Sequence, residues 1–177
     1  MKQNSKGFSL IELLIVVAII LIIAAIAIPD LLKSRQAANQ ASAVGSLRTI
    51  NTSEVAYSTT YTQGFSPDLF DLDGTVVPST NVAAGLIDSV LASGIKSNYH
   101  FQYVSNVTPA VADTCVAAPT AVTTGTVPAA GTTYSSYFIG ADPLGCASGN
   151  YYFTDMSGVI RINTSTPAGP ADGPLAG

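Results

Sequence analysis

The feature that most constrains this chain is a long apolar run near its N-terminus. The run extends from Phe8 to Ile28, and Glu12 is its only charged residue. As an α-helix, these twenty-one residues would be roughly 30 Å long, which matches the hydrocarbon core of a bilayer. The run therefore predicts a helix that can cross a membrane. Lys2 and Lys6 precede it, and they predict an N-terminus on the cytoplasmic side.

Two general interpretations of the run leave its acid unexplained. One is a plain transmembrane anchor. The other is a cleaved secretory signal, because Ala25 and Ala27 are small residues of the kind that precede a signal cleavage site. A carboxylate near a helix end can reach the membrane interface under either interpretation. Carboxylates inside a membrane are nevertheless rare and usually have a partner, so Glu12 calls for a third interpretation.

Residues 6–29 resemble the N-terminal signal of the type IV pilin and pseudopilin family. The likeness rests on a basic leader, a glycine, an aromatic residue, an acid five residues into the mature chain and a later proline: Lys6, Gly7, Phe8, Glu12 and Pro29. The resemblance implies that residues 1–7 are a leader peptide. A prepilin peptidase would cleave between Gly7 and Phe8, and Phe8 would then be N-methylated. Residues 8–29 would form the membrane helix and later the filament core.

The resemblance also gives Glu12 a partner, the Phe8 ammonium of a neighbouring subunit. A buried ammonium and a buried carboxylate each cost several kcal/mol alone and are tolerable only as a close pair. Our hypothesis is that Glu12 sets the register of the subunits. Leu21 stands where many family members have glycine. The resemblance implies local melting between this position and Pro29, whereas leucine is the better helix former by about 0.8 kcal/mol, so the sequence leaves open whether the helix melts there.

The chain after Pro29 predicts an α+β head at residues 30–177. A helix is expected to continue from Asp30 to about Tyr61, with an apolar stripe that Glu54 interrupts. Strands are expected at residues 98–105 and 134–141, and a hairpin at 150–163 that turns at 155–158. The predicted fold is thus one long helix, membrane-spanning in its N-terminal half and amphipathic in its C-terminal half, packed on three or four antiparallel strands. The stripe comprises Ala43, Leu47, Ile50, Tyr57 and Tyr61.

Shorter segments complete the predicted head. A helical turn is expected to start at residues 66–68, and an amphipathic helix at residues 81–94. Residues 108–133 form a Thr-rich loop, and residues 167–177 form a Pro- and Gly-rich tail that we expect to be flexible.

An acid-rich turn contains Asp68, Asp71, Asp73 and Gly74. It is a weak calcium candidate, since some pseudopilins bind this ion. The spacing lacks the third alternating ligand and the later glutamate of an EF-hand loop. We therefore expect a solvated Asp-Gly turn, and no metal or other cofactor.

Cys115 and Cys146 are the two cysteines, and both lie in the part expected outside the cytoplasm. An even number in an oxidising compartment predicts a disulfide. Closing a loop of about thirty residues would stabilise the head by about 3–4 kcal/mol. In the family such a bridge usually lies near the C-terminus, whereas here 31 residues follow Cys146.

Composition argues against several functions. Only 10% of residues are charged and the net charge is −4, and no basic cluster supports nucleic-acid binding. The single histidine, His100, has no accompanying nucleophile or metal-binding motif, so an enzyme is not expected.

The resemblance implies a structural subunit of a type IV pilus-like filament, which is a helical homopolymer. The implied partners are the prepilin peptidase and methylase, an inner-membrane assembly platform and its ATPase. The protein would cross the inner membrane once before assembly, and would afterwards lie in a surface pilus or a periplasmic pseudopilus. The alternatives are a pseudopilin of a type II secretion system and, from another class, a membrane-anchored or secreted binding domain. The motif does not separate adhesion, twitching motility, DNA uptake and secretion, or a major from a minor subunit.

Overall fold

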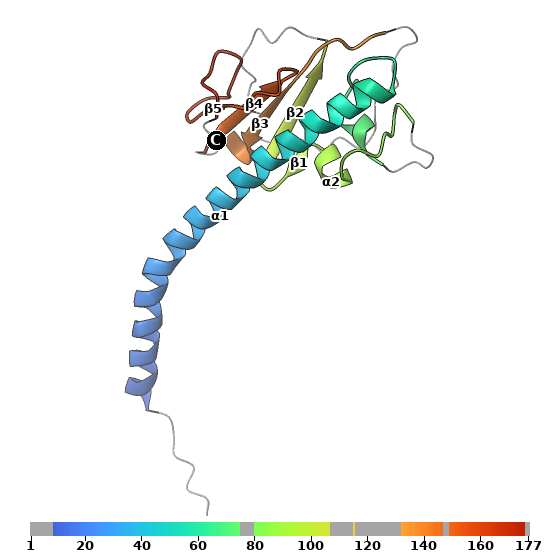
Figure 1. Ribbon diagram of the computed structural model, residues 1–177. Helices are drawn as coiled ribbons and strands as arrows, with labels where there is room; N and C mark the ends of the chain where they lie inside the picture. Colours follow the sequence, from blue (N-terminus) through green and yellow to red (C-terminus); the bar gives the residue numbers. More distant parts are fainter. Residues whose placement is uncertain (1–8, 75–79, 107–114, 116–131, 147–148, 176–177) are drawn as a thin grey trace, which may run out of the picture. The chain divides into compact units, whose positions relative to one another are not determined.

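The computed structural model describes residues 9–74, 80–106, 115, 132–146 and 149–175. The chain divides into two compact units, Met1–Ala38 and Asn39–Gly177. Helix α1 (Leu10–Thr60) runs through the first unit and continues into the second (Figure 1). The second unit lies within the head predicted at residues 30–177, and from here on the word head means this unit. It contains all the strands that the structure describes.

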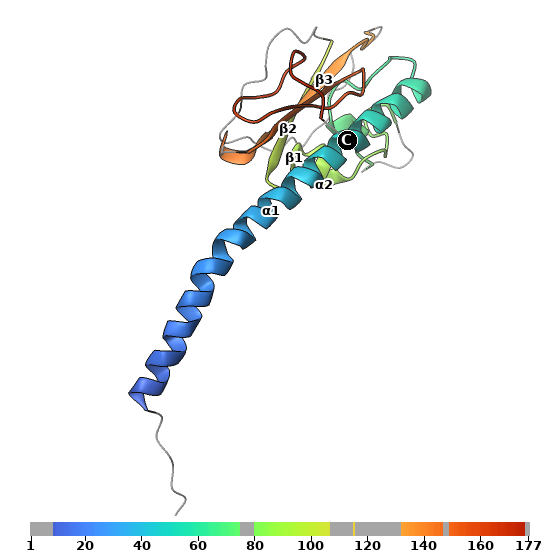
Figure 2. The same ribbon diagram turned by 60° about the vertical axis from the view of Figure 1, so that its left-hand side comes forward.

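In the first unit, α1 is one continuous helix. Its ribbon is unbroken in Figure 2, and the helix includes both Leu21 and Pro29. Ser9 precedes the helix, and its carbonyl oxygen accepts the backbone N–H groups of Glu12 and Leu13 at 3.1 and 3.3 Å. Serine followed three residues later by glutamate is the sequence pattern of a capping box, which favours a helix start at this point. The segment before Pro29 is therefore helical, a point that the sequence left open.

The head is built on the C-terminal part of α1. The stripe predicted from the sequence is buried: Ala43, Leu47, Ile50 and Tyr57 are each 0% exposed. Glu54 interrupts this apolar stripe, as the sequence indicates, and it is itself 0% exposed. Its carboxylate lies on the same buried face and accepts hydrogen bonds there instead of reaching water.

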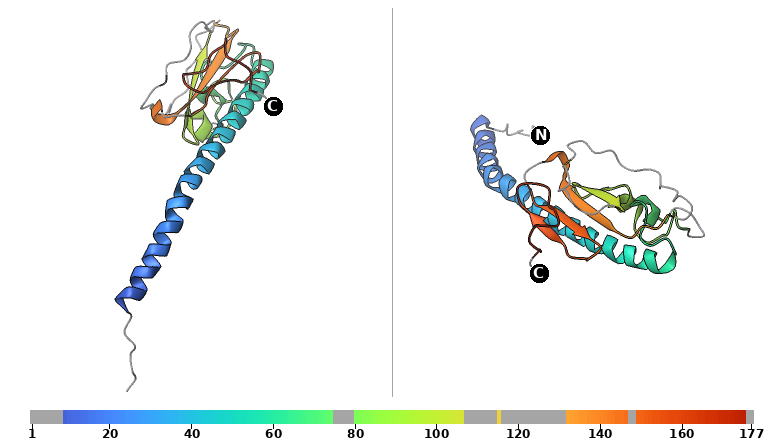
Figure 3. Two further views of the ribbon diagram at one scale, coloured as in Figure 1. Left: turned by 90° about the vertical axis from the view of Figure 1, so that its left-hand side faces the viewer. Right: turned by 90° about the horizontal axis from the view of Figure 1, so that it is seen from above.

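Within the described residues, five antiparallel strands form one sheet in sequence order: β1 (Ile95–Lys96), β2 (Tyr99–Ser105), β3 (Tyr137–Pro143), β4 (Tyr151–Asp155) and β5 (Arg161–Asn163). The strands expected from the sequence are confirmed, and β1 is one more than expected. The predicted hairpin is also confirmed, since Tyr152 pairs with Ile162 and the Gly158 N–H donates to the Asp155 carbonyl. The C-terminal part of α1 lies along one face of this sheet (Figure 3).

Two apolar clusters lie on opposite faces of the sheet. The larger one joins α1, the segment after it and one face of the strands. The smaller one contains Phe138, Phe153, Tyr151 and Ala168, and so uses the other face. Both faces are covered because successive side chains of a strand point in opposite directions. The principal members of the larger cluster are Leu47, Ile50, Tyr57, Leu72, Leu91, Phe101, Ile139 and Tyr152.

The helix predicted at residues 81–94 is wrong over most of its length. Only Ser89–Ala92 is helical, as α2, and the Asp88 carboxylate caps it by accepting the Leu91 N–H at 3.0 Å. The residues before it pair their backbone with another segment. The N–H groups of Ala84 and Leu86 donate to the carbonyls of Asp71 and Leu72. Tertiary pairing thus replaces the local helix that the apolar spacing indicated.

The helical turn predicted at residues 66–68 is also misplaced. The short 3₁₀ helix of this region is η1 (Phe70–Leu72), and the chain turns again at η2 (Leu144–Cys146) after β3. Ser66, where the turn was expected to start, instead donates both its N–H and its hydroxyl to the Glu54 carboxylate.

The tail makes contacts that its composition did not predict. The Leu175 N–H donates to the Ile160 carbonyl at 2.7 Å, and the Ile162 N–H donates to Gly173 at 3.1 Å. Ala168 is 1% exposed. The Thr-rich loop at 108–133 lies outside the described residues, apart from Cys115 and residues 132–133.

Candidate functional site: the N-terminal assembly segment

The candidate site is the first part of α1, residues 10–28, which we call the assembly segment. Its large apolar side chains are 46–80% exposed. Apolar surface of this extent is costly in water, at about 25 cal/mol for each Å², so the segment needs lipid or other helices around it. Among the described residues, α1 is the one helix long and apolar enough to cross a membrane. The exposed side chains include Leu10, Ile11, Leu13, Leu14, Ile15, Val16, Val17, Ile19, Ile20, Leu21, Ile22, Ile23, Ile26 and Ile28.

Glu12 is the one charged residue of the assembly segment and lies in the first turn of α1. A carboxylate at this position interacts favourably with the partial positive charge of a helix N-terminus. Its side chain is exposed, and it is therefore a single negative group on an otherwise apolar surface. Gly7 and Phe8, the predicted processing residues, lie outside the described residues. Pro29 lies inside α1 and is exposed.

The acid-rich turn of the head differs from the solvated turn that we expected. Asp71 and Asp73 are 0% and 3% exposed. The Asp68 carboxylate accepts the Asp71 N–H at 3.0 Å, and the Asp73 carboxylate accepts the Gly74 N–H at 2.7 Å. Burial, with the nearby charge of Asp68, raises the pKa of Asp71 to about 8. Nowhere in the described part of the chain do three or more His, Cys, Asp or Glu residues form a group that could hold a metal ion.

A buried polar cluster joins α1 to the loop after it and to β2. The Glu54 carboxylate accepts the backbone N–H of Ser66 at 2.9 Å and also the Ser66 hydroxyl. The Tyr103 hydroxyl donates to the Ser66 carbonyl at 2.9 Å. Burial raises the pKa of Glu54, and the hydrogen bonds from Ser66 partly oppose that rise. Sequence reasoning missed this cluster, although an acid within a helical apolar stripe was a signal for it.

The predicted disulfide is confirmed. Cys115 and Cys146 are bonded, with Cα atoms 5.8 Å apart. Cys146 ends η2, directly after β3, and the partly buried Cys115 packs against the smaller apolar cluster. The bridge therefore attaches residue 115 of the Thr-rich loop to one edge of the core.

His100 is half-buried on β2, where it pairs in register with Asp142 of β3. Burial lowers the pKa of its imidazole. His100 also lines a small cavity of about 160 Å³, together with Asp68, Gln102 and Tyr103 among others.

Comparisons with known proteins point to the assembly segment and not to the head. A family model described as "Prokaryotic N-terminal methylation motif" matches residues 2–28. The type IV wide pilus major component PilA4 of Thermus thermophilus is 65% identical over 37 residues, which are 21% of this chain and 28% of that protein. The chain thus matches little more than a quarter of this relative's length. No solved structure matches the chain.

The motif and the fold agree with each other. The matched residues include the candidate cleavage residues, Glu12 and nearly all of the exposed apolar surface of α1. The same helix continues into a head with an antiparallel sheet, which is the architecture that the motif predicts. The N-terminal segment of the chain thus carries the prokaryotic N-terminal methylation motif and is similar to that of a type IV pilus component.

Proposed function

We propose that the protein is a structural subunit of a type IV pilus-like filament that assembles through its N-terminal helix. The observation that carries the proposal is the assembly segment, an exposed apolar helix with one carboxylate in its first turn. Lipid satisfies the apolar surface before assembly, and the helices of neighbouring subunits satisfy it afterwards. The name of the Thermus relative, a major pilus component, supports a pilus rather than a pseudopilus.

The proposed maturation has two chemical steps. A prepilin peptidase hydrolyses the Gly7–Phe8 peptide bond on the cytoplasmic side, which releases residues 1–7 and leaves an ammonium on Phe8. This nitrogen, after it loses a proton, then attacks the methyl group of a methyl donor, which leaves in its demethylated form. Both steps act on a chain held in the inner membrane by the assembly segment, and an assembly platform with its ATPase then extracts the chain into the filament.

Glu12 acquires its role when the helices leave the membrane. The Phe8 ammonium and the Glu12 carboxylate would each be buried among apolar helices, at a cost of several kcal/mol for each isolated ion. A neighbouring subunit at the correct axial stagger brings opposite charges together, whereas other staggers leave them unpaired. Glu12 therefore selects one register of the filament.

The first test is the intact mass of the protein in a surface fraction sheared from cells. We expect a chain that starts at Phe8 and carries one additional methyl group. A correctly processed chain that is present in the membrane and absent from the sheared fraction would instead support the pseudopilin alternative. A chain that starts at Met1, or near residues 26–30, would overturn the filament proposal in favour of an anchored or secreted domain.

The second test is the substitution Glu12→Gln. Membrane insertion should be retained and filament yield should fall by about tenfold or more, because breaking a buried ion pair costs about 3–5 kcal/mol. Asp30→Asn is the matched control, since Asp30 is an exposed acid of the same helix beyond the apolar run. Normal filament yield from the Glu12 variant would contradict the assigned role.

A further inference from the structure

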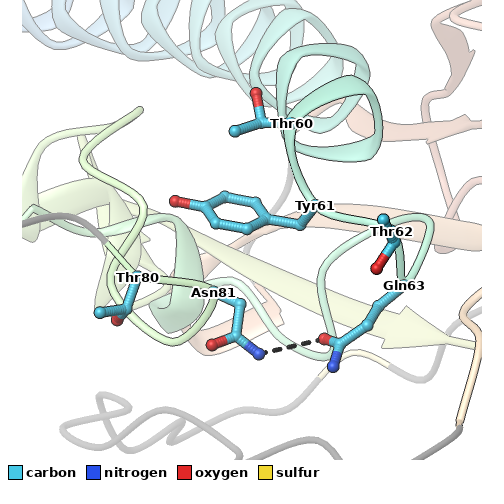
Figure 4. Close-up of a pocket in the computed structure, with 6 residues that line it drawn as sticks. All are labelled: Thr60, Tyr61, Thr62, Gln63, Thr80 and Asn81. Atoms are coloured by element: carbon cyan, nitrogen blue, oxygen red, sulfur yellow. Dashed lines mark hydrogen bonds between the residues drawn. The ribbon is translucent and has the colours of Figure 1, made fainter.

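An open pocket of about 300 Å³ lies in the head, where the chain leaves the C-terminal end of α1 (Figure 4). Its volume is at the small end of the range for ligand-binding pockets. Two segments line it: residues 60–63 at the C-terminal end of α1, and residues 80–81, which precede α2 in the chain. Of the residues that the structure describes, those that line the pocket are Thr60, Tyr61, Thr62, Gln63, Thr80 and Asn81.

The chemistry of the lining is uniform. All six side chains carry a hydroxyl or an amide, and none is charged. Hydroxyls and amides both donate and accept hydrogen bonds. A charged ligand would lose hydration here without meeting an opposite charge, which is unfavourable. The pocket thus favours an uncharged ligand that carries several hydrogen-bonding groups of its own.

The two amides hold each other in place. The Asn81 Nδ2 group donates to the Gln63 Oε1 atom at 3.1 Å, as drawn in Figure 4. Their backbones are also fixed, since the Gln63 carbonyl accepts the Tyr134 N–H and the Asn81 carbonyl accepts the Tyr57 hydroxyl. Within the part of the chain that the structure describes, no hydrogen bond engages Gln63 Nε2 or Asn81 Oδ1, so the paired amides offer one donor and one acceptor. Such preorganisation lowers the entropy cost of binding.

Tyr61 adds an aromatic surface beside the amides. Its side chain points from the end of α1 toward the segment that carries Thr80 and Asn81 (Figure 4). The Tyr57 ring packs against it, with centroids 4.7 Å apart, and so supports its orientation. Tyrosine presents an apolar ring and a polar tip. A pyranose has the complementary surfaces, because its C–H groups form apolar faces and its hydroxyls project from the rim.

We propose that this pocket binds one neutral pyranose unit, either as a free sugar or as the end of a glycan. The Tyr61 ring contacts the sugar face, and Gln63 and Asn81 bond to adjacent hydroxyls. The inference goes beyond a structural role in the filament and does not depend on filament assembly.

The experiment uses the full ¹⁵N-labelled chain in dodecylphosphocholine micelles, because many other detergents carry sugar head groups. The probes are methyl β-glucopyranoside, methyl β-galactopyranoside and N-acetylglucosamine. With at least one of them, we expect saturable shifts of the Gln63 and Asn81 side-chain amide signals, at about millimolar affinity. N-acetylneuraminic acid, an anionic sugar, should give no shift. Absence of saturable shifts with all three neutral sugars would overturn the proposal, as would tighter binding of the anionic one.

Two variants assign the binding to this pocket. Tyr61→Ala and Gln63→Ala should each raise the Kd by about tenfold, which corresponds to the loss of one ligand contact. The two variants remove different contacts with the sugar, so either one tests the assignment if the other variant does not fold. The backbone amide spectrum shows whether each variant is folded. Gln36→Ala is the control, because Gln36 is an exposed amide of α1 outside the pocket. An unchanged Kd in a folded pocket variant, or an equal loss in the control, would contradict the assignment.

Comparison of single sugars with longer glycans identifies the source of the ligand. Tighter binding of a neutral tetrasaccharide than of its terminal sugar would indicate a glycan that extends beyond the pocket. Equal affinity would indicate a free sugar. Either result supports a neutral pyranose as the ligand.

Discussion

Glu54 of α1 and Ser66 of the following loop are joined by two hydrogen bonds inside the head, one from the serine N–H at 2.9 Å and one from its hydroxyl. No ion pair accompanies the carboxylate, because the one salt bridge among the described residues is Lys96–Asp88. Two donors from one residue therefore compensate for the burial of this acid. Through Tyr103, which donates to the Ser66 carbonyl, the same contact reaches β2.

Removal of the Glu54 carboxylate should destabilise the head. In Glu54→Ala, the N–H and hydroxyl of Ser66 lose their acceptor inside the core, and an unsatisfied buried donor costs about 1–3 kcal/mol. We expect a loss of about 2 kcal/mol or more in the free energy of unfolding, measured by urea titration with circular dichroism. Val55→Ala is the control, since Val55 is the next residue and is 59% exposed. Similar losses in the two variants would contradict the role of the Glu54 hydrogen bonds.

Asp71 should make the stability of the head depend on pH. Its pKa is raised from 3.8 to about 8, so the folded state holds a proton that the unfolded state releases between these values. Stability from this group is complete below about pH 4 and is lost as the pH rises toward 8. Asp71→Asn should therefore flatten the decline in unfolding free energy between pH 5 and pH 8. Any decline that persists is expected to come from Glu54, whose pKa is also raised by burial.

Asp88→Asn is the matched control for this pH experiment. Its carboxylate is exposed, and a hydrogen bond from Lys96 lowers its pKa. Because the pKa of Asp88 is lowered and not raised, its contribution to stability is lost as the pH falls. The substitution should therefore leave the decline in unfolding free energy between pH 5 and pH 8 unchanged. An Asp71→Asn variant with the same pH profile as the unmodified protein would show that Asp71 is ionised in the fold.

The disulfide should contribute about 3–4 kcal/mol to the head by restricting the unfolded chain. The double variant Cys115→Ser/Cys146→Ser should therefore unfold at lower urea concentration than the oxidised protein. Dithiothreitol should produce the same shift in the unmodified protein and none in the double variant. Membrane insertion should be unchanged, because both cysteines lie in the head. Equal stability of the oxidised protein and the double variant would show that the bridge does not stabilise the fold.

Sequence patterns predicted the features of this protein that depend on local periodicity. The apolar run, the stripe on α1, the strands and the β4–β5 hairpin all follow from side-chain spacing along one element. The N-terminal motif could be identified for a related reason, since it occupies consecutive residues. Cysteine count together with the expected compartment was sufficient for the Cys115–Cys146 pair.

Features that depend on contacts between distant segments were not predictable in this way. Residues 84–87 pair their backbone with residues 71–73, so the apolar spacing that indicated a helix there had a different cause. The turn that contains Asp71 was expected to be solvated because acids usually are, and no burial was predicted for Glu54. The burial of both acids follows from neighbours that pack against them. The pocket around Tyr61 and Asn81 joins segments about twenty residues apart, and no local pattern marks such a site.

Ala168 tests whether the C-terminal tail is part of the folded head. It is 1% exposed and packs against Phe138, Tyr151 and Phe153, although the composition of the tail indicates flexibility. In Ala168→Arg, a charged side chain has no room in this cluster. Overpacking costs about 1–3 kcal/mol, and we expect a loss of this size in urea unfolding, with faster cleavage of the tail by protease. Ala171→Arg adds the same side chain at an exposed position of the same tail and should have little effect. Equal behaviour of the two variants would mean that the tail is not docked in solution, and that the smaller apolar cluster is covered by something else.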